Sequence, residues 1–337
     1  MKLLLTAALP VWAALLASAG GATAQAKLLA LSKGDHTLAI VDPVTLKVVA
    51  KAPVGSDPHE VIASADGRTA YVTIYGGGSL HELDVIDLVH GTALHPIDTK
   101  PFMGPHGITF VGGKVWFTAE GSKCVVRYDP ASGTFDWTMG TGQNRTHMIY
   151  VTPDQRRVYT TNVSSGTVSI LVDTVIGPGG PGAPRPHGDW AQTVIPVSRG
   201  SEGFDVSPDG KQLWAAAADD GTVAVIDLAS KTVVDKIDAG VLGANRLQFT
   251  RDGRLVLISS LRSGDIAVLD AATHKAVKKI AIGHGAAGIL MEPDGSRAFI
   301  GCTADDYVAV IDLKTLTVVG RIDVGKGPDG LAWATPQ

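Results

Sequence analysis

The sequence is poor in charged side chains and in cysteine. Charged residues make up 18% of the 337 residues, and the formal net charge is −4. No basic stripe is present to attract a phosphate backbone, so nucleic acid is not an expected partner. The two cysteines, Cys124 and Cys302, fall in non-adjacent units of the repeat described below. We therefore expect two free, buried thiols and no disulfide.

Long apolar runs are absent after the N-terminus. Met1-Lys2 gives a short positive start, residues 3–19 are almost wholly apolar, and the run GGATAQA ends in small residues typical of a cleavage site. Residues 1–26 are therefore predicted to be a secretory signal peptide. An uncleaved anchor is the less favoured alternative, because the segment is short. The mature chain is expected to lack a transmembrane segment and to be periplasmic or secreted.

Several sequence motifs of known chemistry are also missing. The chain contains no nucleophile elbow, phosphate-binding loop or His-Glu-x-x-His helix, which weakens the case for catalysis of those kinds. It contains no Cys-x-x-Cys-His motif for covalent haem attachment. The chemistry must therefore be sought in residues that the fold brings together.

What the sequence does contain is 40 glycines and a repeat of about 42 residues. The repeat unit has a turn such as SPDGK, an apolar run such as QLWAAAA, a second run such as GTVAVIDL and a third such as VVDKIDAG. The apolar residue that opens each unit recurs seven times, at Val61, Ile108, Ile149, Phe204, Leu247, Ile289 and Leu331. Each unit reads as four short strands, several of them apolar at consecutive positions, as in sheets that are buried on both faces.

A four-stranded unit repeated at this period is typical of a propeller blade. We therefore predict an all-β, seven-bladed β-propeller that forms one domain over residues 27–337. The N-terminus supplies second, third and fourth strands without a first, and the C-terminal GPDGLAWATPQ is a first strand alone. The N-terminal strands should pair with this C-terminal strand and close the ring. Residues 174–190, rich in Gly and Pro, are expected to be an insertion loop without helix or strand in blade four, counting the N-terminal strands as part of blade one.

Two of the repeats carry a recognisable motif. Tyr71-Val72-Thr73 and Tyr159-Thr160-Thr161-Asn162 resemble the YVTN repeats of the YncE-like β-propeller proteins, which belong with the propellers of nitrous oxide reductase and the heme d1 domain of cytochrome cd1. The resemblance covers residues 27–337. It implies the fold, whereas relatives of this kind include enzymes, electron-transfer modules and binding proteins, so it implies no single function.

Conspicuous polar residues separate onto the two faces of the predicted ring. One set ends the third strand of six blades, where aspartate caps a turn by accepting backbone N–H bonds, so we expect a structural role. This set contains Asp42, Asp87, Asp129, Asp227, Asp270 and Asp312. A second set occupies one position ahead of the apolar residue of each unit and should gather at the mouth of the central channel. It consists of His59, His106, His147, Glu202, Asn245, Ala287 and Asp329.

The three histidines of this second set lie in consecutive blades and are the candidate metal ligands. His59, His106 and His147 with the carboxylate of Glu202 are ligand types suited to a divalent transition metal, and a three-histidine site leaves a position open. Two alternatives remain: these imidazoles hydrogen-bond one another, loop carbonyls and water, or they act on a substrate without a metal.

Basic residues flank this ring in the same connections. Arg145, Arg199, Arg246 and Lys326, together with Asn245, suggest binding of an anionic group, and ordinary solvated loop charges are the alternative. Glu60, Glu120, His81, Asp219, Asp305 and Asp306 border the same face without a discernible pattern.

The sequence therefore favours a monomeric, exported binding protein that holds a small ligand, a metal or a protein partner at the channel mouth. The alternative function is a metal- or histidine-dependent lyase or lactonase acting at the same place. Electron transfer in the manner of nitrous oxide reductase fits less well, because that copper cluster takes histidines from nearly the whole ring and this ring offers three.

Overall fold

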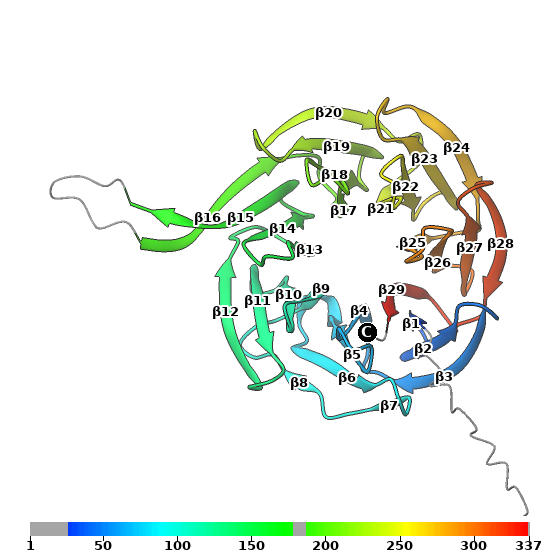
Figure 1. Cartoon of the computed structure of the whole chain (residues 1–337), viewed down its shortest axis with the longest axis horizontal. Helices are drawn as coiled ribbons and strands as arrows, with labels where there is room; N and C mark the ends of the chain where they lie inside the picture. The colour runs from blue at the N-terminus through cyan, green and yellow to red at the C-terminus, as the bar shows by residue number, and fades with distance from the viewer. Residues whose placement is uncertain (1–25, 178–186, 336–337) are drawn as a thin grey trace, which may run out of the picture.

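The computed structural model describes residues 26–177 and 187–335. These residues form seven antiparallel sheets arranged in a ring, which confirms the predicted seven-bladed propeller (Figure 1). None of the described helices could span a bilayer. Apart from Ala26, the predicted signal peptide lies outside the described residues, so export remains a prediction.

Each blade is a meander of four strand positions, numbered here from the axis outwards. The innermost strands are β29 (Pro328–Ala334), β4 (Pro58–Ala63), β9 (Pro105–Val111), β13 (Thr146–Val151), β17 (Ser201–Val206), β21 (Ala244–Phe249) and β25 (Ala286–Met291) for blades 1 to 7. The second strands are β1 (Lys27–Ser32), β5 (Thr69–Ile74), β10 (Lys114–Ala119), β14 (Arg157–Asn162), β18 (Gln212–Ala217), β22 (Leu255–Ser260) and β26 (Arg297–Cys302).

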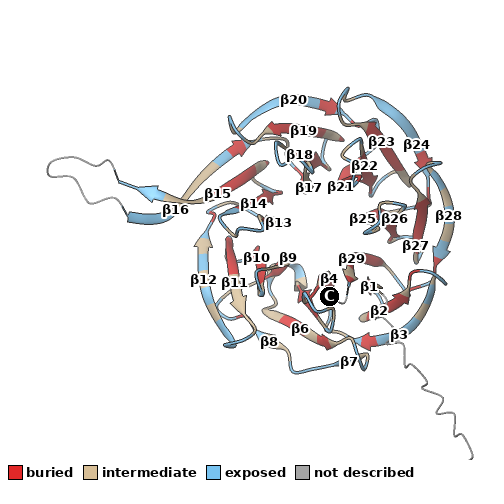
Figure 2. Cartoon of the chain, in the orientation of Figure 1, coloured by how far each residue is buried: buried red, intermediate tan, exposed pale blue. Residues whose placement is uncertain are grey.

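The fourth, outermost strand of each blade is the most exposed, whereas the second and third strands are mostly buried (Figure 2). The third strands are β2 (Thr37–Asp42), β6 (Glu82–Asp87), β11 (Cys124–Asp129), β15 (Thr167–Ile176), β19 (Thr222–Asp227), β23 (Asp265–Asp270) and β27 (Tyr307–Asp312). The fourth strands are β3 (Lys47–Pro53), β7 (Thr92–Ala93) with β8 (Ile97–Asp98), β12 (Thr134–Gly140), β16 (His187–Pro196), β20 (Thr232–Asp238), β24 (Ala276–Ala281) and β28 (Thr317–Ile322). A short 3-10 turn, η1 (Gly76–Gly78), follows β5.

The hydrophobic core is divided among the blade interfaces. Each of seven apolar clusters joins two neighbouring blades, and together the clusters complete the circle. Leu29 of blade 1, for example, belongs to the same cluster as Val72 of blade 2. The apolar runs of the second and third strands are buried because both faces of each sheet are covered by neighbouring blades.

Ring closure follows the predicted route. β29 pairs with β1 in antiparallel register, with Leu29 opposite Ala332 and Leu28 opposite Trp333. The sheet order β29-β1-β2-β3 therefore joins the two ends of the chain in one blade. This blade leaves no open edge at the junction. The two cysteines are buried and unbridged, as the sequence predicts.

The six aspartates that end third strands act as turn caps. Oδ1 of Asp42 accepts hydrogen bonds from the backbone N–H groups of Val44 and Thr45, at 2.8 and 3.2 Å, and Oδ1 of Asp312 accepts one from Thr315. Asp87, Asp129, Asp227 and Asp270 make equivalent bonds. Because these carboxylates bind the backbone of the turns, we assign them a structural role; the face that carries them is called the turn face below.

The insertion in blade 4 differs from the sequence-based expectation. Residues 174–190 were expected to lack strands, yet β15 continues to Ile176 and β16 begins at His187. Val175 pairs with Gly188, and Thr174 pairs with Asp189. The reason is that the β15–β16 ladder continues past the ring as a two-stranded hairpin, which projects from it (Figure 1). Residues 178–186 at its tip lie outside the described residues.

A buried carboxyl links blades 5 and 6 and gives the fold a pH dependence. Asp205 accepts hydrogen bonds from the backbone N–H groups of Phe249, at 2.9 Å, and Val206, at 2.8 Å. Burial raises the pKa of Asp205 to about 7. The carboxyl of Asp205 therefore binds its proton more tightly in the folded protein than in the unfolded chain. Protonation of Asp205 stabilises the fold fully below about pH 4, and this stabilisation is lost as the pH rises through 7.

We predict that Asp205→Asn removes this loss. Between pH 4.5 and 8, the free energy of unfolding of the variant should improve relative to wild type by about 1–2 kcal/mol, measured by urea unfolding at each pH. Asp209→Asn is the control: hydrogen bonds from Ser207 and Lys211 lower the pKa of Asp209, so this carboxyl is ionised in both states throughout the range and its removal should change stability by the same amount at every pH. A relative stability of Asp205→Asn that does not change with pH would contradict the prediction.

Candidate functional site

The predicted ring of polar residues is present at one level of the channel. His59, His106, His147, Glu202, Asn245, Ala287 and Asp329 each occupy the second position of an innermost strand. The ring centroids of His59 and His106 are 4.7 Å apart, and those of His106 and His147 are 3.8 Å apart. The three imidazoles therefore converge at the channel mouth.

Glycine and threonine explain why neighbouring innermost strands approach so closely. A Cβ on Gly107 would lie 2.4 Å from the carbonyl oxygen of His147, so only glycine fits between β9 and β13. The hydroxyl of Thr118 donates to the carbonyl oxygen of His147, at 2.6 Å, and accepts from the N–H of Gly107, at 2.9 Å. Thr73 makes the same bridge between the carbonyl of His106 and the N–H of Glu60. The Thr of the YVTN-type repeat thus joins adjacent blades beside the site.

Glu120 is the second component of the site. It follows β10 directly, and its Oε1 accepts a hydrogen bond from Nδ1 of His147, while its Oε2 accepts one from the Tyr75 hydroxyl at 2.5 Å. Nε of Arg145 lies 3.5 Å from the same Oε2. Burial acts to raise the pKa of Glu120, but the hydrogen bond from His147 and the nearby positive charges outweigh it and hold the pKa below its ordinary value. Glu120 is therefore a buried carboxylate.

His106 lies between the other two imidazoles and is 2% exposed. Burial, followed by the neighbouring His147 and His59, lowers its pKa well below the ordinary value, so the ring is neutral at physiological pH. Its Nδ1 is buried without a hydrogen-bond partner. Such an atom is costly unless something else satisfies it.

Ligand atoms of His106, Glu120 and His147 all lie within 4.8 Å of one another. His59 lies beside this group and has other partners, because its Nε2 accepts from Nζ of Lys33 at 2.8 Å and its Nδ1 faces the carbonyl oxygen of Asp57 at 3.1 Å. The compact group therefore combines two of the three predicted histidines with a carboxylate that the sequence pattern did not single out.

An ion pair between Arg246 and Glu60 crosses the channel mouth. Arg246 follows Asn245 on β21, and its Nη2 lies 2.5 Å from Oε1 of Glu60 on β4. β21 and β4 lie on opposite sides of the ring centre (Figure 1), so the guanidinium crosses the channel. Burial raises the pKa of Glu60 to about 7, although Arg246 opposes this effect. Nη1 of Arg246 and Oδ1 of Asn245 are buried without hydrogen-bond partners.

The remaining predicted residues have different surroundings. Asp329 pairs with Lys33 at 3.3 Å, and the charge of Glu202 acts on Arg246 and Arg145. Arg199 and Lys326 are exposed. Of the residues that border the face, His81 pairs with Asp98, and Asp305 pairs with His284.

Comparison with known proteins supports the propeller fold. The sequence matches the family described as the cytochrome D1 heme domain over residues 200–288. The structure is similar to the dihydro-heme d1 dehydrogenase NirN in complex with DHE, with a TM-score of 0.63 and 18% identity over 89% of this chain and 64% of that chain. The similar structures are propellers that share the fold of this chain, and the family match covers part of the ring.

Other propellers of this kind match over nearly their whole length. A putative 6-phosphogluconolactonase from Bacteroides uniformis has a TM-score of 0.72 and 16% identity, covering 91% of this chain and 99% of that chain. A functionally unknown protein from Desulfotomaculum acetoxidans has a TM-score of 0.72 and 13% identity, covering 92% and 99%. No curated protein sequence matches the chain.

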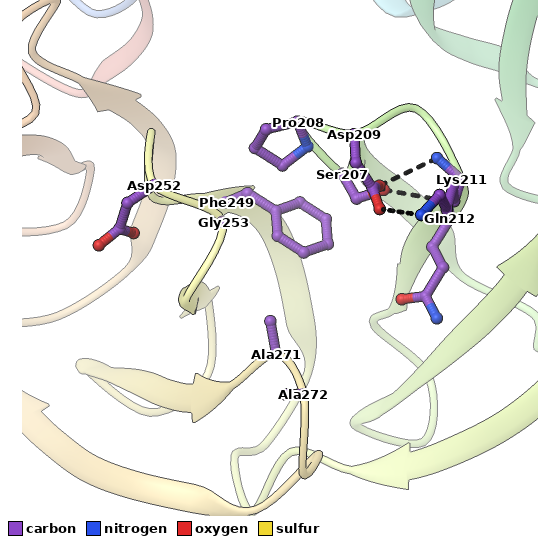
Figure 3. A pocket seen from close by; sticks show the side chains of 10 residues that line it. All are labelled: Ser207, Pro208, Asp209, Lys211, Gln212, Phe249, Asp252, Gly253, Ala271 and Ala272. Carbon is purple, nitrogen blue, oxygen red and sulfur yellow. Dashed lines mark hydrogen bonds and ion pairs between the residues drawn. The ribbon is translucent and has the colours of Figure 1, made fainter.

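A surface hollow of the propeller lies on the turn face between blades 5 and 6, and no histidine lines it. Its volume is about 350 Å³, and Pro208, Phe249 and Ala271 contribute to its lining (Figure 3). The carboxylate of Asp209 at its edge is bonded to Ser207 and to the N–H of Lys211. Because its polar groups serve the turns, we assign the candidate site to the channel mouth, where buried polar atoms without partners converge.

Proposed function

We propose that this propeller is a metal-binding protein that holds a divalent transition metal at the channel mouth through His106, His147 and Glu120. The observation that carries the proposal is the 4.8 Å grouping of their ligand atoms, together with the unpartnered Nδ1 of the neutral His106. Two imidazoles and one carboxylate form a ligand set that suits zinc and iron and leaves positions open for a small ligand.

The surroundings of Glu120 support this assignment. Tyr75 and Arg145 contact Oε2, which orients the carboxylate and leaves Oε1 directed at His147. A metal ion would replace the proton that Nδ1 of His147 and Oε1 of Glu120 now share. Partners that orient ligands in this way are typical of metal sites.

The test is zinc affinity and metal content of the mature chain purified without a histidine tag. We expect roughly one metal ion per chain in wild type, and a loss of affinity of at least about 100-fold in His106→Ala, His147→Ala and Glu120→Gln. His81→Ala is the matched control, because His81 is a partly exposed histidine paired with Asp98. Wild-type protein that binds no zinc, or site variants that bind it as tightly as the control, would refute the proposal.

Glu60 favours a second candidate function, a lyase or lactonase at the same mouth. Its pKa of about 7 allows it to exchange a proton near neutral pH, which is the property required of a general acid or base. The putative lactonase from Bacteroides uniformis shares the fold. Hydrolysis of a lactone by the metal-loaded protein, lost in Glu60→Gln, would establish this activity, and a metal-loaded protein inert to lactones would exclude hydrolysis of the lactones tested.

A further inference from the structure

The charges at the channel mouth determine what a bound metal can hold. Four carboxylates, those of Glu60, Glu120, Glu202 and Asp329, act on Arg246. Three cationic side chains, Lys33, Arg145 and Arg246, pair with members of this set. Asp57 adds a fifth carboxylate, 3.7 Å from Lys33. Without metal the mouth therefore has two excess negative charges when all eight groups are ionised, and a divalent metal neutralises them. The loaded site can accept an anion, whereas the metal-free site repels one.

Arg246 is the group best placed to receive that anion. Its guanidinium is bonded to Glu60 through Nη2 alone, although the fork of an arginine can bind a carboxylate through two nitrogens. Nη1 is buried without a partner. Arg246 is also close enough to the metal-ligand group for its charge to act on both His106 and Glu120. The charge of Arg246 therefore attracts an anion held at the metal.

Asn245, the neighbour of Arg246 on β21, has a second buried polar atom that a ligand could bond. Its side chain is 3% exposed, and Oδ1 has no hydrogen-bond donor. A carbonyl oxygen buried in this way needs an O–H or N–H group. Nη1 of Arg246 thus lacks an acceptor and Oδ1 of Asn245 lacks a donor, and the two residues are consecutive on β21, with Asn245 at the level of the histidines. A ligand that carries a carboxylate beside a hydroxyl satisfies both.

We propose that the metal-loaded mouth binds a small α-hydroxy carboxylate, with its carboxylate on the metal and Nη1 of Arg246 and its hydroxyl on Oδ1 of Asn245. This inference rests on the proposed metal site and adds the class of its ligand. It also assigns a recognition role to Arg246 and Asn245, which hold no metal themselves.

The test uses zinc-loaded protein and three probes of similar size, titrated calorimetrically. Glycolate carries both groups, acetate lacks the hydroxyl, and glycolamide lacks the charge. Wild type should bind glycolate at least tenfold more tightly than either of the others. Arg246→Lys, which keeps the charge but loses the fork, should weaken glycolate binding at least tenfold. Asn245→Ala should remove the preference for glycolate over acetate. Arg262→Lys, a change in an exposed arginine of the loop after β22, should leave all three affinities unchanged.

Zinc content measured on the same samples separates the two proposals. If wild type holds no zinc, the proposed function fails, and this inference fails with it. If zinc is bound but glycolate and acetate bind equally, or Arg246→Lys leaves glycolate affinity intact, the ligand class is wrong while the metal site stands. Thermal melts identify a variant that does not fold. If Arg246→Lys unfolds, the ligand class is tested with Asn245→Ala alone, because this variant keeps the Arg246–Glu60 ion pair. Glycolate that is still preferred over acetate by Asn245→Ala would then contradict the inference.

Discussion

Removal of residues 328–337 is expected to abolish the cooperative fold of the whole ring. The deletion takes away β29, which forms five registered residue pairs with β1 and packs Leu331 and Trp333 against the core between blades 7 and 1. At about 1 kcal/mol per hydrogen bond and about 1.5–3 kcal/mol per large apolar side chain, the loss is on the order of 10 kcal/mol. This is comparable to the total stability of a typical domain, about 5–15 kcal/mol. Differential scanning calorimetry of the truncated chain should show no cooperative transition.

The controls for this deletion separate closure from general damage. Val319→Ala changes a side chain that is 56% exposed on β28, in the neighbouring blade, and should alter stability by no more than about 0.5 kcal/mol. A synthetic peptide of residues 328–335 added to the truncated chain should restore the transition, because it supplies the missing strand. A truncated chain that melts cooperatively at the wild-type temperature would show that the ring does not depend on β29.

The fold was predictable because its determinants are local and repeated. Each blade carries its own turn aspartate and apolar runs, so the pattern recurs often enough to fix the strand count. The error at residues 174–190 has a physical cause. Glycine and proline were taken to end the strands, whereas pairing between β15 and β16 continues through Val175 and Gly188 beyond the ring. Cross-strand partners extended strands that local composition argued against.

The candidate site was predicted only in part. Strand register places the histidines at one level, and register can be read from the repeat. Three further residues, Lys33, Tyr75 and Glu120, had no role assigned from the sequence. Each contacts a histidine of the next blade, and such contacts can be predicted only when the relative position of neighbouring sheets is known. A signal exists nevertheless in the residue directly after each second strand. Around the ring these residues are Lys33, Tyr75, Glu120, Val163, Ala218, Leu261 and Thr303.

Three members of this second ring match the three histidines blade by blade. Lys33 bonds His59, Tyr75 packs edge-on against His106 with ring centroids 5.0 Å apart, and Glu120 bonds His147. The next three members, Val163, Ala218 and Leu261, are apolar, so the members that contact the histidines come from blades 1 to 3. The crossing of the channel by Arg246 could not have been foreseen, since it depends on a channel width that no local pattern encodes.

Gly107→Ala should weaken both the fold and the metal site. The added Cβ would lie 2.4 Å from the carbonyl oxygen of His147 and 2.8 Å from Cα of Met148. Both are backbone atoms that cannot rotate away, so β9 and β13 must separate and strain the bridge through Thr118. We expect a loss of about 3 kcal/mol in the free energy of unfolding and a loss of at least about tenfold in zinc affinity. Urea unfolding and zinc titration measure the two effects.

Gly140→Ala is the matched control for this substitution. Gly140 ends β12, and no heavy atom lies within 4 Å of the Cβ it would acquire. Its replacement should change stability by no more than about 0.5 kcal/mol and leave zinc affinity unaltered. If Gly107→Ala lowers stability but not zinc affinity, the spacing of β9 and β13 supports the fold without setting the distance between His106 and His147. If it changes neither, the contact between these two strands is not what brings the imidazoles together.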